Sequence, residues 1–308
     1  MITFNSLDDI INIDDTAVAL GNFDGVHLGH QQLIKEMTDR ARQRDLKPAV
    51  FTFSNHPKDL LPNRPKVKNI LYKGEKERLI YALGAEYLFS IPFTQQLMIM
   101  SPEDYVREII IGRLRAKEIF CGFNHRFGYR GAGTPELMKK VASEYGVAVN
   151  IMEPFTKDGS VVSSSLIRTL IFGGRVGRCR DYMGRYYAVR GEVVVGNRLG
   201  RRLGFPTSNL VIDEDTVVPP NGVYVTYCVF EGRRHPSVTN VGVKPTIGSC
   251  KKNIETHIFD FDMTLYGKTI EVEFVTKMRD EVKFDSMDEL SEQIVRDCRE
   301  ARAFHETL

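Results

Sequence analysis

The pattern of apolar residues changes near Tyr186, and this change limits the fold more than any other feature of the sequence. Before Tyr186, short apolar runs alternate with amphipathic stretches. After it, apolar runs follow one another with Gly, Pro and Asn between them. Alternating strands and helices are typical of a parallel sheet with helices on both faces, and a succession of strands is typical of a small antiparallel barrel. The sequence therefore predicts two domains of different architecture.

The predicted boundaries follow from this pattern. An α/β domain is expected over residues 1–170, and an antiparallel β-barrel with one terminal helix over 186–308. The glycine- and arginine-rich segment 171–185 is predicted to be a linker. Strands of the first domain are expected over Ala17–Leu20, Lys47–Phe53, Glu86–Ile91, Lys117–Cys121 and Val147–Met152, with helices over 29–42, Glu75–Leu83 and near Pro135–Tyr145. Strands of the second are expected over 187–196, 222–232, 235–242, 255–261 and 268–278, with a helix over Ser286–Phe304.

Composition excludes several classes of function. The net charge of +2, from 42 basic and 40 acidic residues, gives no electrostatic reason to expect nucleic acid or a membrane surface as a partner. The first residues have no basic start followed by an apolar run, and no stretch reaches the roughly 18 apolar residues of a spanning helix. The 5 cysteines are odd in number and widely spaced, without a CxxC pair. We therefore expect a cytoplasmic protein. The sequence leaves open whether it forms a homo-oligomer.

The segment GNFDGVHLGH lies between the first predicted strand and the first predicted helix. Ligands of a parallel α/β sheet bind beyond the carboxyl ends of its strands, and a helix N-terminus there offers free N–H groups to a phosphate. Gly21, Gly25 and Gly29 allow a tight turn. His27 and His30 flank Gly29 and are placed to donate hydrogen bonds to one bound anion. Two surface histidines in a glycine-rich turn, or a zinc site, are the alternatives.

Two later segments add candidate ligands to this turn. CGFNHRFGYRGAG follows the strand Lys117–Cys121 and contains Asn124, whose amide is suited to a base edge. VSSSLIR begins a helix at Ser163–Ser165, so that Ser164 lies at a helix start and Arg168 one turn later, where it could hold a phosphate. A plain helix cap is the simpler interpretation of the serines.

Together these motifs resemble the adenylyltransferase module of bacterial bifunctional riboflavin kinase/FAD synthetases, with FTFSNHP at Phe51–Pro57 and SIPF at Ser90–Phe93. That module is similar to HxGH nucleotidyltransferases, which implies a Rossmann-like fold over residues 1–170. Where the family commonly has Asp-Phe before RFG, this chain has Asn124-His125. The resemblance implies catalytic roles for His27 and His30, and ATP contacts for a further set in the same segments: Gly21, Phe23, Gly29, Asn124, Ser164 and Arg168.

The second part opens with GNRLGRRLGFPTSNL, in which Gly196, Gly200 and Gly204 predict a phosphate-cradling loop that is not a Walker sequence. Thr207 and Asn209 lie on one side of an extended segment, and their oxygens are hard ligands suited to Mg²⁺. Glu255 in IETHIFDF is placed to accept a proton from an attacking hydroxyl. A solvated strand carboxylate is the alternative for Glu255.

This part resembles the riboflavin kinase module, a six-stranded barrel with a terminal helix. GRRLGFPTSNL, NGVYV, TNVGVKPTIG, IETHIFDFDMTLYGK and MRDEVKFDSMDELSEQI occur in the order of that family. The resemblance implies that Thr207 and Asn209 hold Mg²⁺–ATP and that Glu255 is the catalytic base. It also implies that Asn240 and Arg279 border the flavin.

Both resemblances together imply an enzyme with two activities. Riboflavin and ATP would give FMN and ADP, and FMN and a second ATP would give FAD and pyrophosphate, with Mg²⁺ as cofactor. Two other functions remain as alternatives. One is a nucleotidyltransferase with a different phosphate acceptor, against which the kinase motifs on the same chain argue. The other is a flavin-binding protein with inactive sites, which the full set of motif residues disfavours.

Overall fold

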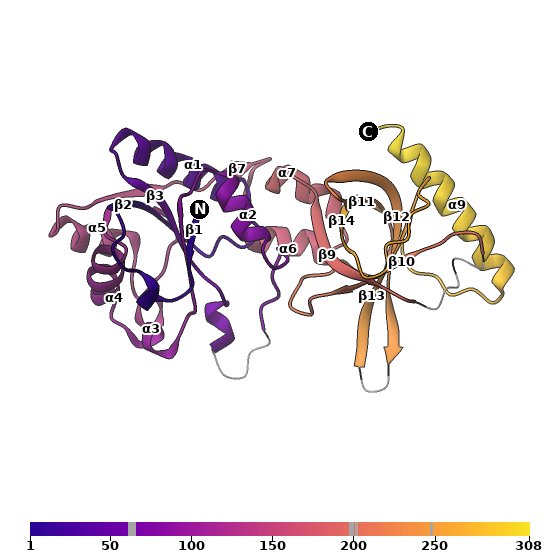
Figure 1. Ribbon diagram of the computed structural model, residues 1–308, viewed down its shortest axis with the longest axis horizontal. Helices are drawn as coiled ribbons and strands as arrows, with labels where there is room; N and C mark the ends of the chain where they lie inside the picture. Colours follow the sequence, from indigo (N-terminus) through magenta and orange to yellow (C-terminus); the bar gives the residue numbers. More distant parts are fainter. Residues whose placement is uncertain (61–65, 197–199, 201–202, 247–248) are drawn as a thin grey trace. The chain divides into compact units, whose positions relative to one another are not determined.

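The computed structural model describes residues 1–60, 66–196, 200, 203–246 and 249–308. It divides into two compact units (Figure 1). The first comprises Met1–Val67 and Lys73–Ser163, and the second comprises Lys68–Tyr72 and Ser164–Leu308. In the part of the chain that is described, no helix has both the length and the apolar character needed to cross a membrane.

The first unit is built on a parallel sheet of 6 strands in the order β1-β4-β3-β2-β5-β6. This confirms the predicted Rossmann-like architecture. The expected strand over Lys47–Phe53 is found at those residues, and the others differ by a residue or so at their ends. The strands are β1 (Ile2–Phe4), β2 (Thr16–Leu20), β3 (Lys47–Phe53), β4 (Tyr87–Ile91), β5 (Ala116–Gly122) and β6 (Ala148–Met152), and a hairpin of β7 (Thr156–Lys157) and β8 (Ser160–Val161) follows.

Helices cover the two faces of this sheet because the strands carry apolar side chains on both. Val18 and Leu20 of β2 belong to the core shared with α3, η3 and α5, while α1 packs against β2, β3 and β5. The helical segments are η1 (Leu7–Asp9), α1 (Leu28–Gln43), η2 (Pro57–Leu60), α2 (Glu75–Ala82), α3 (Gln95–Ile99), α4 (Pro102–Asp104), the π-helical η3 (Tyr105–Arg113), η4 (Tyr129–Gly131) and α5 (Pro135–Ser143).

The chain reverses its direction of winding between β2 and β5. From β2 the sheet grows outward to β3 on one side and to β5 on the other. In open α/β sheets a ligand crevice lies at such a switch point, beyond the carboxyl ends of the strands. The turn after Leu20 and the loop after Gly122 therefore begin at adjacent positions on this edge.

The second unit contains a closed antiparallel barrel in the order β10-β13-β12-β11-β14-β9, with α9 (Met287–His305) against it. This confirms the predicted barrel with a terminal helix (Figure 1). The extended segment predicted around Asn209 forms a separate strand, β10. The barrel strands are β9 (Tyr187–Val194), β10 (Ser208–Ile212), β11 (Gly222–Phe230), β12 (Arg233–Thr246), β13 (Ser249–Ile258) and β14 (Thr269–Arg279).

The segment predicted as a linker is helical and lies in the same unit as the barrel. It contains the end of α6 (Ser164–Phe172), then η5 (Val176–Arg178) and α7 (Cys179–Met183). The backbone of Gly177 passes so close to β14 that a Cβ there would lie 2.6 Å from the carbonyl oxygen of Val275. Val176, Cys179 and Met183 are almost fully buried. The functional division at residues 170 and 186 stays a prediction.

We expect a fragment of residues 186–308 to be less stable than one of residues 164–308. Removing α6, η5 and α7 exposes the barrel surface against which they pack, and each fully buried apolar side chain contributes about 1.5–3 kcal/mol. The free energy of unfolding should therefore fall by at least roughly 3 kcal/mol. Urea unfolding of both fragments measures this, and equal midpoints would show that the segment does not stabilise the barrel.

Candidate active sites

The glycine-rich turn after β2 has an unusual backbone. Phe23, Gly25 and Val26 have φ angles of 49°, 84° and 34°, in the left-handed region. Only glycine adopts this region without cost, and other residues pay on the order of 1–3 kcal/mol. The Nε2 group of Gln31 donates a hydrogen bond to the carbonyl oxygen of Val26 at 2.9 Å. The first turn of α1 thus holds the strained segment in place.

Three predicted ATP-binding residues of this turn support its shape. The Phe23 ring is fully buried, and a Cβ on Gly21 would lie 3.0 Å from it. A Cβ on Gly29 would lie 3.2 Å from the Cβ of Phe155. The two glycines permit close packing, and Phe23 fills the space beneath the turn. ATP contacts for these residues stay predictions.

The two histidines of the motif form a stacked pair. His27 caps α1, because its Nδ1 accepts a hydrogen bond from the backbone N–H of His30 at 3.2 Å. The rings lie 3.5 Å apart between centroids, with 17° between their planes. An accepting Nδ1 carries no proton, so in neutral His27 the proton is on Nε2. The cap therefore fixes the tautomer of His27.

His30 is kept neutral by its surroundings. Burial, followed by the nearby His27 and Lys76, holds the pKa of His30 well below its usual 6.5. Its Nδ1 is buried and has no hydrogen-bond partner among the described residues. A buried polar atom without a partner is costly, and a ligand atom would relieve that cost.

The loop after β5 supplies the other side of the switch point. Asn124 is exposed there, as a residue that reads a ligand must be before binding. His125 is partly buried and stacks on Phe127, with ring centroids 5.7 Å apart, and within the described structure its buried Nε2 has no hydrogen-bond partner. Burial lowers the pKa of His125 to about 4.

Ser164 and Arg168 lie in the second compact unit. Ser164 begins α6, as predicted from the serine run. The Nε and Nη2 atoms of Arg168 each donate to the carbonyl oxygen of Lys68 at 3.3 Å. Roles for these two residues in ATP binding stay predictions.

The barrel brings several predicted kinase residues into one row. Asn209 of β10 pairs with Glu255 of β13, and Glu255 pairs in turn with Asn240 of β12. The row continues through Val223 of β11 to Arg279 of β14. Directly paired residues point to the same face of a sheet, with Cβ atoms about 4.5–5.5 Å apart. An amide, a carboxylate and a second amide therefore meet on one face of the barrel.

Each glycine of the predicted phosphate-cradling loop occupies a position where a side chain would be unfavourable, for a different reason in each case. A Cβ on Gly196 would lie 2.4 Å from Nδ2 of Asn209, and a Cβ on Gly200 would lie 2.3 Å from the carbonyl oxygen of Phe205. Gly204 has a φ of 87°, which favours glycine. The rest of the predicted loop, residues 197–199 and 201–202, lies outside the described residues.

The Asn209 side chain fits a cation. It is buried, and its Oδ1 accepts no hydrogen bond from the described residues. An amide oxygen is a hard ligand of the kind that Mg²⁺ prefers, together with hydroxyl and phosphate oxygens. Nowhere in the described structure do three or more His, Cys, Asp or Glu side chains gather to hold a metal ion. The residues present thus suit Mg²⁺ held jointly with phosphates.

Glu255 and Arg279 already have partners in the structure. Nδ2 of Asn253 donates to Oε1 of Glu255 at 2.6 Å, which orients the carboxylate. Arg279 forms a bidentate pair with Asp297 of α9, with Nε–Oδ1 and Nη2–Oδ2 distances of 2.9 and 2.6 Å. Arg279 therefore ties α9 to the barrel, whether or not it also borders a flavin.

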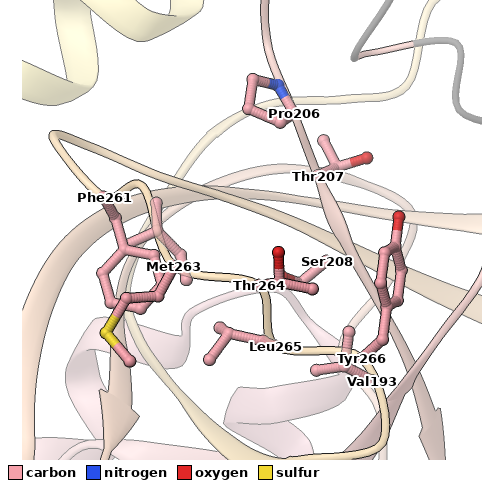
Figure 2. Close-up of a pocket in the computed structure, with 10 residues that line it drawn as sticks. Val193, Pro206, Thr207, Ser208, Phe261, Met263, Thr264, Leu265 and Tyr266 are labelled. Atoms are coloured by element: carbon pink, nitrogen blue, oxygen red, sulfur yellow. The ribbon is translucent and has the colours of Figure 1, made fainter.

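A small cleft, open to solvent, lies beside Thr207. Figure 2 shows Thr207 and Tyr266 on one side of it and Phe261 and Met263 on the other. Leu265 adds to the apolar wall. Thr207 was predicted from its motif, whereas these wall residues, which belong to the connection between β13 and β14, were not. They lie in the segment IETHIFDFDMTLYGK, which carries the family resemblance but no local pattern typical of a binding cleft.

Both parts of the chain are similar to known protein families. A family model described as FAD synthetase matches residues 10–166, and one described as riboflavin kinase matches residues 183–305. A bifunctional riboflavin kinase/FMN adenylyltransferase from Bacillus subtilis (strain 168) is 34% identical over 95% of this chain and 93% of its own. One of the same name from Escherichia coli (strain K12) is 32% identical over 93% and 92%. A solved structure titled as a macrolide-efflux protein from Streptococcus pneumoniae is 33% identical, covers 98% of both chains and has a TM-score of 0.90.

The lowered pKa of the partly buried His125 predicts an acid-sensitive first unit. The unfolded chain takes up a proton near the usual pKa of 6.5, whereas folded His125 does so only near 4. Stability is therefore lost as the pH falls from 6.5 to 4, by about 2 kcal/mol at pH 5 from this residue. His125→Phe should reduce this loss. Thermal unfolding at pH 7.5 and pH 5 measures it, and an unchanged acid response in the variant would contradict the assignment.

Proposed function

Because the chain belongs to the bifunctional riboflavin kinase/FMN adenylyltransferase family, we propose that it converts riboflavin to FMN and then FMN to FAD, using ATP in both steps. One observation carries the proposal. The two matched families divide the chain where the architecture changes from parallel sheet to barrel. Chromatography of riboflavin incubated with the protein and Mg²⁺–ATP tests it, because FMN and FAD separate.

The barrel carries out the first reaction. The terminal ribityl hydroxyl of riboflavin attacks the γ-phosphorus of ATP, and the bond from that phosphorus to the β-phosphate oxygen breaks to release ADP. Glu255, oriented by Asn253, takes the hydroxyl proton. Thr207 and Asn209 would hold Mg²⁺, which when bound neutralises phosphate charge. The arrangement of Asn209 beside Glu255 supports this division of roles.

The cleft beside Thr207 receives the base of ATP. Phe261, Met263 and Leu265 offer apolar surface against which a flat base can bury its faces, and the hydroxyl-bearing residues Ser208 and Thr264 line the same cleft. Thr207 at the edge lies where the phosphates would leave the cleft toward the glycine loop.

The parallel-sheet unit carries out the second reaction. An oxygen of the FMN phosphate bonds to the α-phosphorus of the second ATP, and the bond to the bridging oxygen breaks to release pyrophosphate. The free N–H groups of the first turn of α1 and the ring N–H groups of His27 and His30 stabilise the charge that develops. A phosphate oxygen is already a nucleophile, so positioning dominates this step.

The two activities divide at the predicted boundaries, with residues 1–170 for adenylyl transfer, 171–185 between, and 186–308 for the kinase. The partners are riboflavin, FMN and ATP, in the cytoplasm. The small net charge supports the absence of nucleic acid and membrane among them.

His30→Ala should lower FAD formation from supplied FMN by roughly 100–1,000-fold, the usual cost of one preorganised donor. Riboflavin phosphorylation by the same protein should be unchanged, since the barrel carries it out. Rates of both reactions on one preparation measure the effect. Normal FAD synthesis in the variant would remove His30 from the mechanism.

Glu255→Gln should lower riboflavin phosphorylation by roughly 100–10,000-fold, because a glutamine amide accepts no proton at neutral pH. The matched control is Glu192→Gln, which changes an exposed carboxylate on β9 and should leave the rate unchanged. Conversion of supplied FMN to FAD confirms folding in both variants. Near-normal FMN production by folded Glu255→Gln would make this carboxylate structural.

A further inference from the structure

Lys76, which no motif singled out, lies at the carboxyl end of β3. It is in the first turn of α2, and its Nζ donates hydrogen bonds to the carbonyl oxygen of Phe53 at 2.9 Å and to Oγ1 of Thr52 at 3.3 Å. Oγ1 of Thr52 in turn donates to the carbonyl oxygen of Asn22 at 3.0 Å. The ammonium group is thereby tied to the glycine-rich turn in which Asn22 lies.

The ammonium group has bonding capacity left over. An ammonium carries three N–H donors, and no third acceptor from the described residues takes a hydrogen bond from Lys76. Both of its acceptors are neutral oxygens, although the carboxylates of Asp24 and Glu77 lie near enough to favour its charge. A half-buried cation with an N–H to spare is stabilised further by a ligand anion that accepts that hydrogen bond.

Electrostatic effects place Lys76 near the histidine pair. It is among the groups that lower the pKa of His30, so the two side chains lie within range of each other. His30 is in the first turn of α1, whose free N–H groups already favour an anion. The ammonium, the imidazoles and the helix N-terminus therefore surround one region.

We propose that Lys76 binds a phosphate oxygen of the substrates at the N-terminus of α1 and is a further catalytic residue of adenylyl transfer. This rests on the adenylyl transfer proposed above. When the bond from the α-phosphorus to the bridging oxygen breaks, the electron pair stays on the departing pyrophosphate. Neutral His30 supplies only a hydrogen bond there, whereas Lys76 supplies a full positive charge and keeps its proton throughout.

The charge on Lys76 gives a signature that a structural role would not. Burial lowers the pKa of its ammonium below 10.5, against the raising effects of Asp24 and Glu77. The other titratable groups facing it are His30, which is neutral at pH 7, and the adjoining His27. Since the ammonium loses its proton as the pH rises, FAD formation should fall on the alkaline side before pH 10.5 is reached.

The experiment compares three variants of the full chain with the wild type. Lys76→Met should lower kcat/KM for FAD formation by roughly 100-fold, and Lys76→Arg should restore most of it and remove the alkaline decline, because guanidinium stays charged. The matched control, Lys73→Met, changes an exposed lysine of the same segment and should behave as wild type. Riboflavin phosphorylation by each protein controls for folding.

Two further measurements identify which phosphate group Lys76 binds. Weaker inhibition by pyrophosphate in Lys76→Met assigns it to ATP, and a raised KM for FMN assigns it to the FMN phosphate. Either result supports the proposal.

Two results would overturn it. One is a folded Lys76→Met protein with wild-type FAD formation. The other, decisive even if Lys76→Met does not fold, is an active Lys76→Arg protein whose alkaline decline matches that of the wild type. Absence of FAD formation by the wild type itself would instead refute the proposed function.

Discussion

Backbone hydrogen bonds between neighbouring strands bring together the side chains of both candidate sites. In the first unit, Leu20 pairs with Phe51 and with Cys121, so the ends of β2, β3 and β5 lie side by side. The glycine-rich turn, the acceptors of Lys76 and the Asn124 loop all begin there. In the barrel, the pairing of Asn209 with Glu255 brings the side chains of β10 and β13 together in the same way. A slip of one residue would turn these side chains to the opposite face, so strand register is a condition of either chemistry.

Within the first unit, burial determines what the histidines contribute. His27 gives one ring nitrogen to the cap of α1, and burial keeps His30 uncharged. Two imidazoles stacked this closely would repel each other if both were protonated. Neutral rings avoid that repulsion and still donate hydrogen bonds. The positive charge of the region must then come from the helix N-terminus and from a group with a much higher intrinsic pKa, which Lys76 has.

Local pattern predicted the elements well and the sites in part. The strand Lys47–Phe53 and the helix after Ser286 follow directly from apolar periodicity and a capping serine. The proximity of Asn209 and Glu255 could not be predicted from local pattern, because it depends on the barrel register, which pairs segments far apart in the sequence. Lys76 was missed because a lysine at a helix start has no distinctive local pattern. For Glu255, periodicity favoured a solvated strand carboxylate, and only the family resemblance implied a catalytic role.

The two units treat phosphate charge in different ways, and their architectures explain why. A parallel sheet places helix N-termini at one edge, so its site is built from backbone N–H groups and a few side chains around them. An antiparallel barrel has no such helix ends inside its sheet. The site proposed there combines a glycine loop with the buried Oδ1 of Asn209, which has no hydrogen-bond partner among the described residues, and the neighbouring carboxylate of Glu255. Adenylyl transfer needs an attacking phosphate held in place, whereas phosphorylation of a hydroxyl also needs a base. In the barrel, the carboxylate proposed for that role, Glu255, lies directly beside Asn209 on the neighbouring strand.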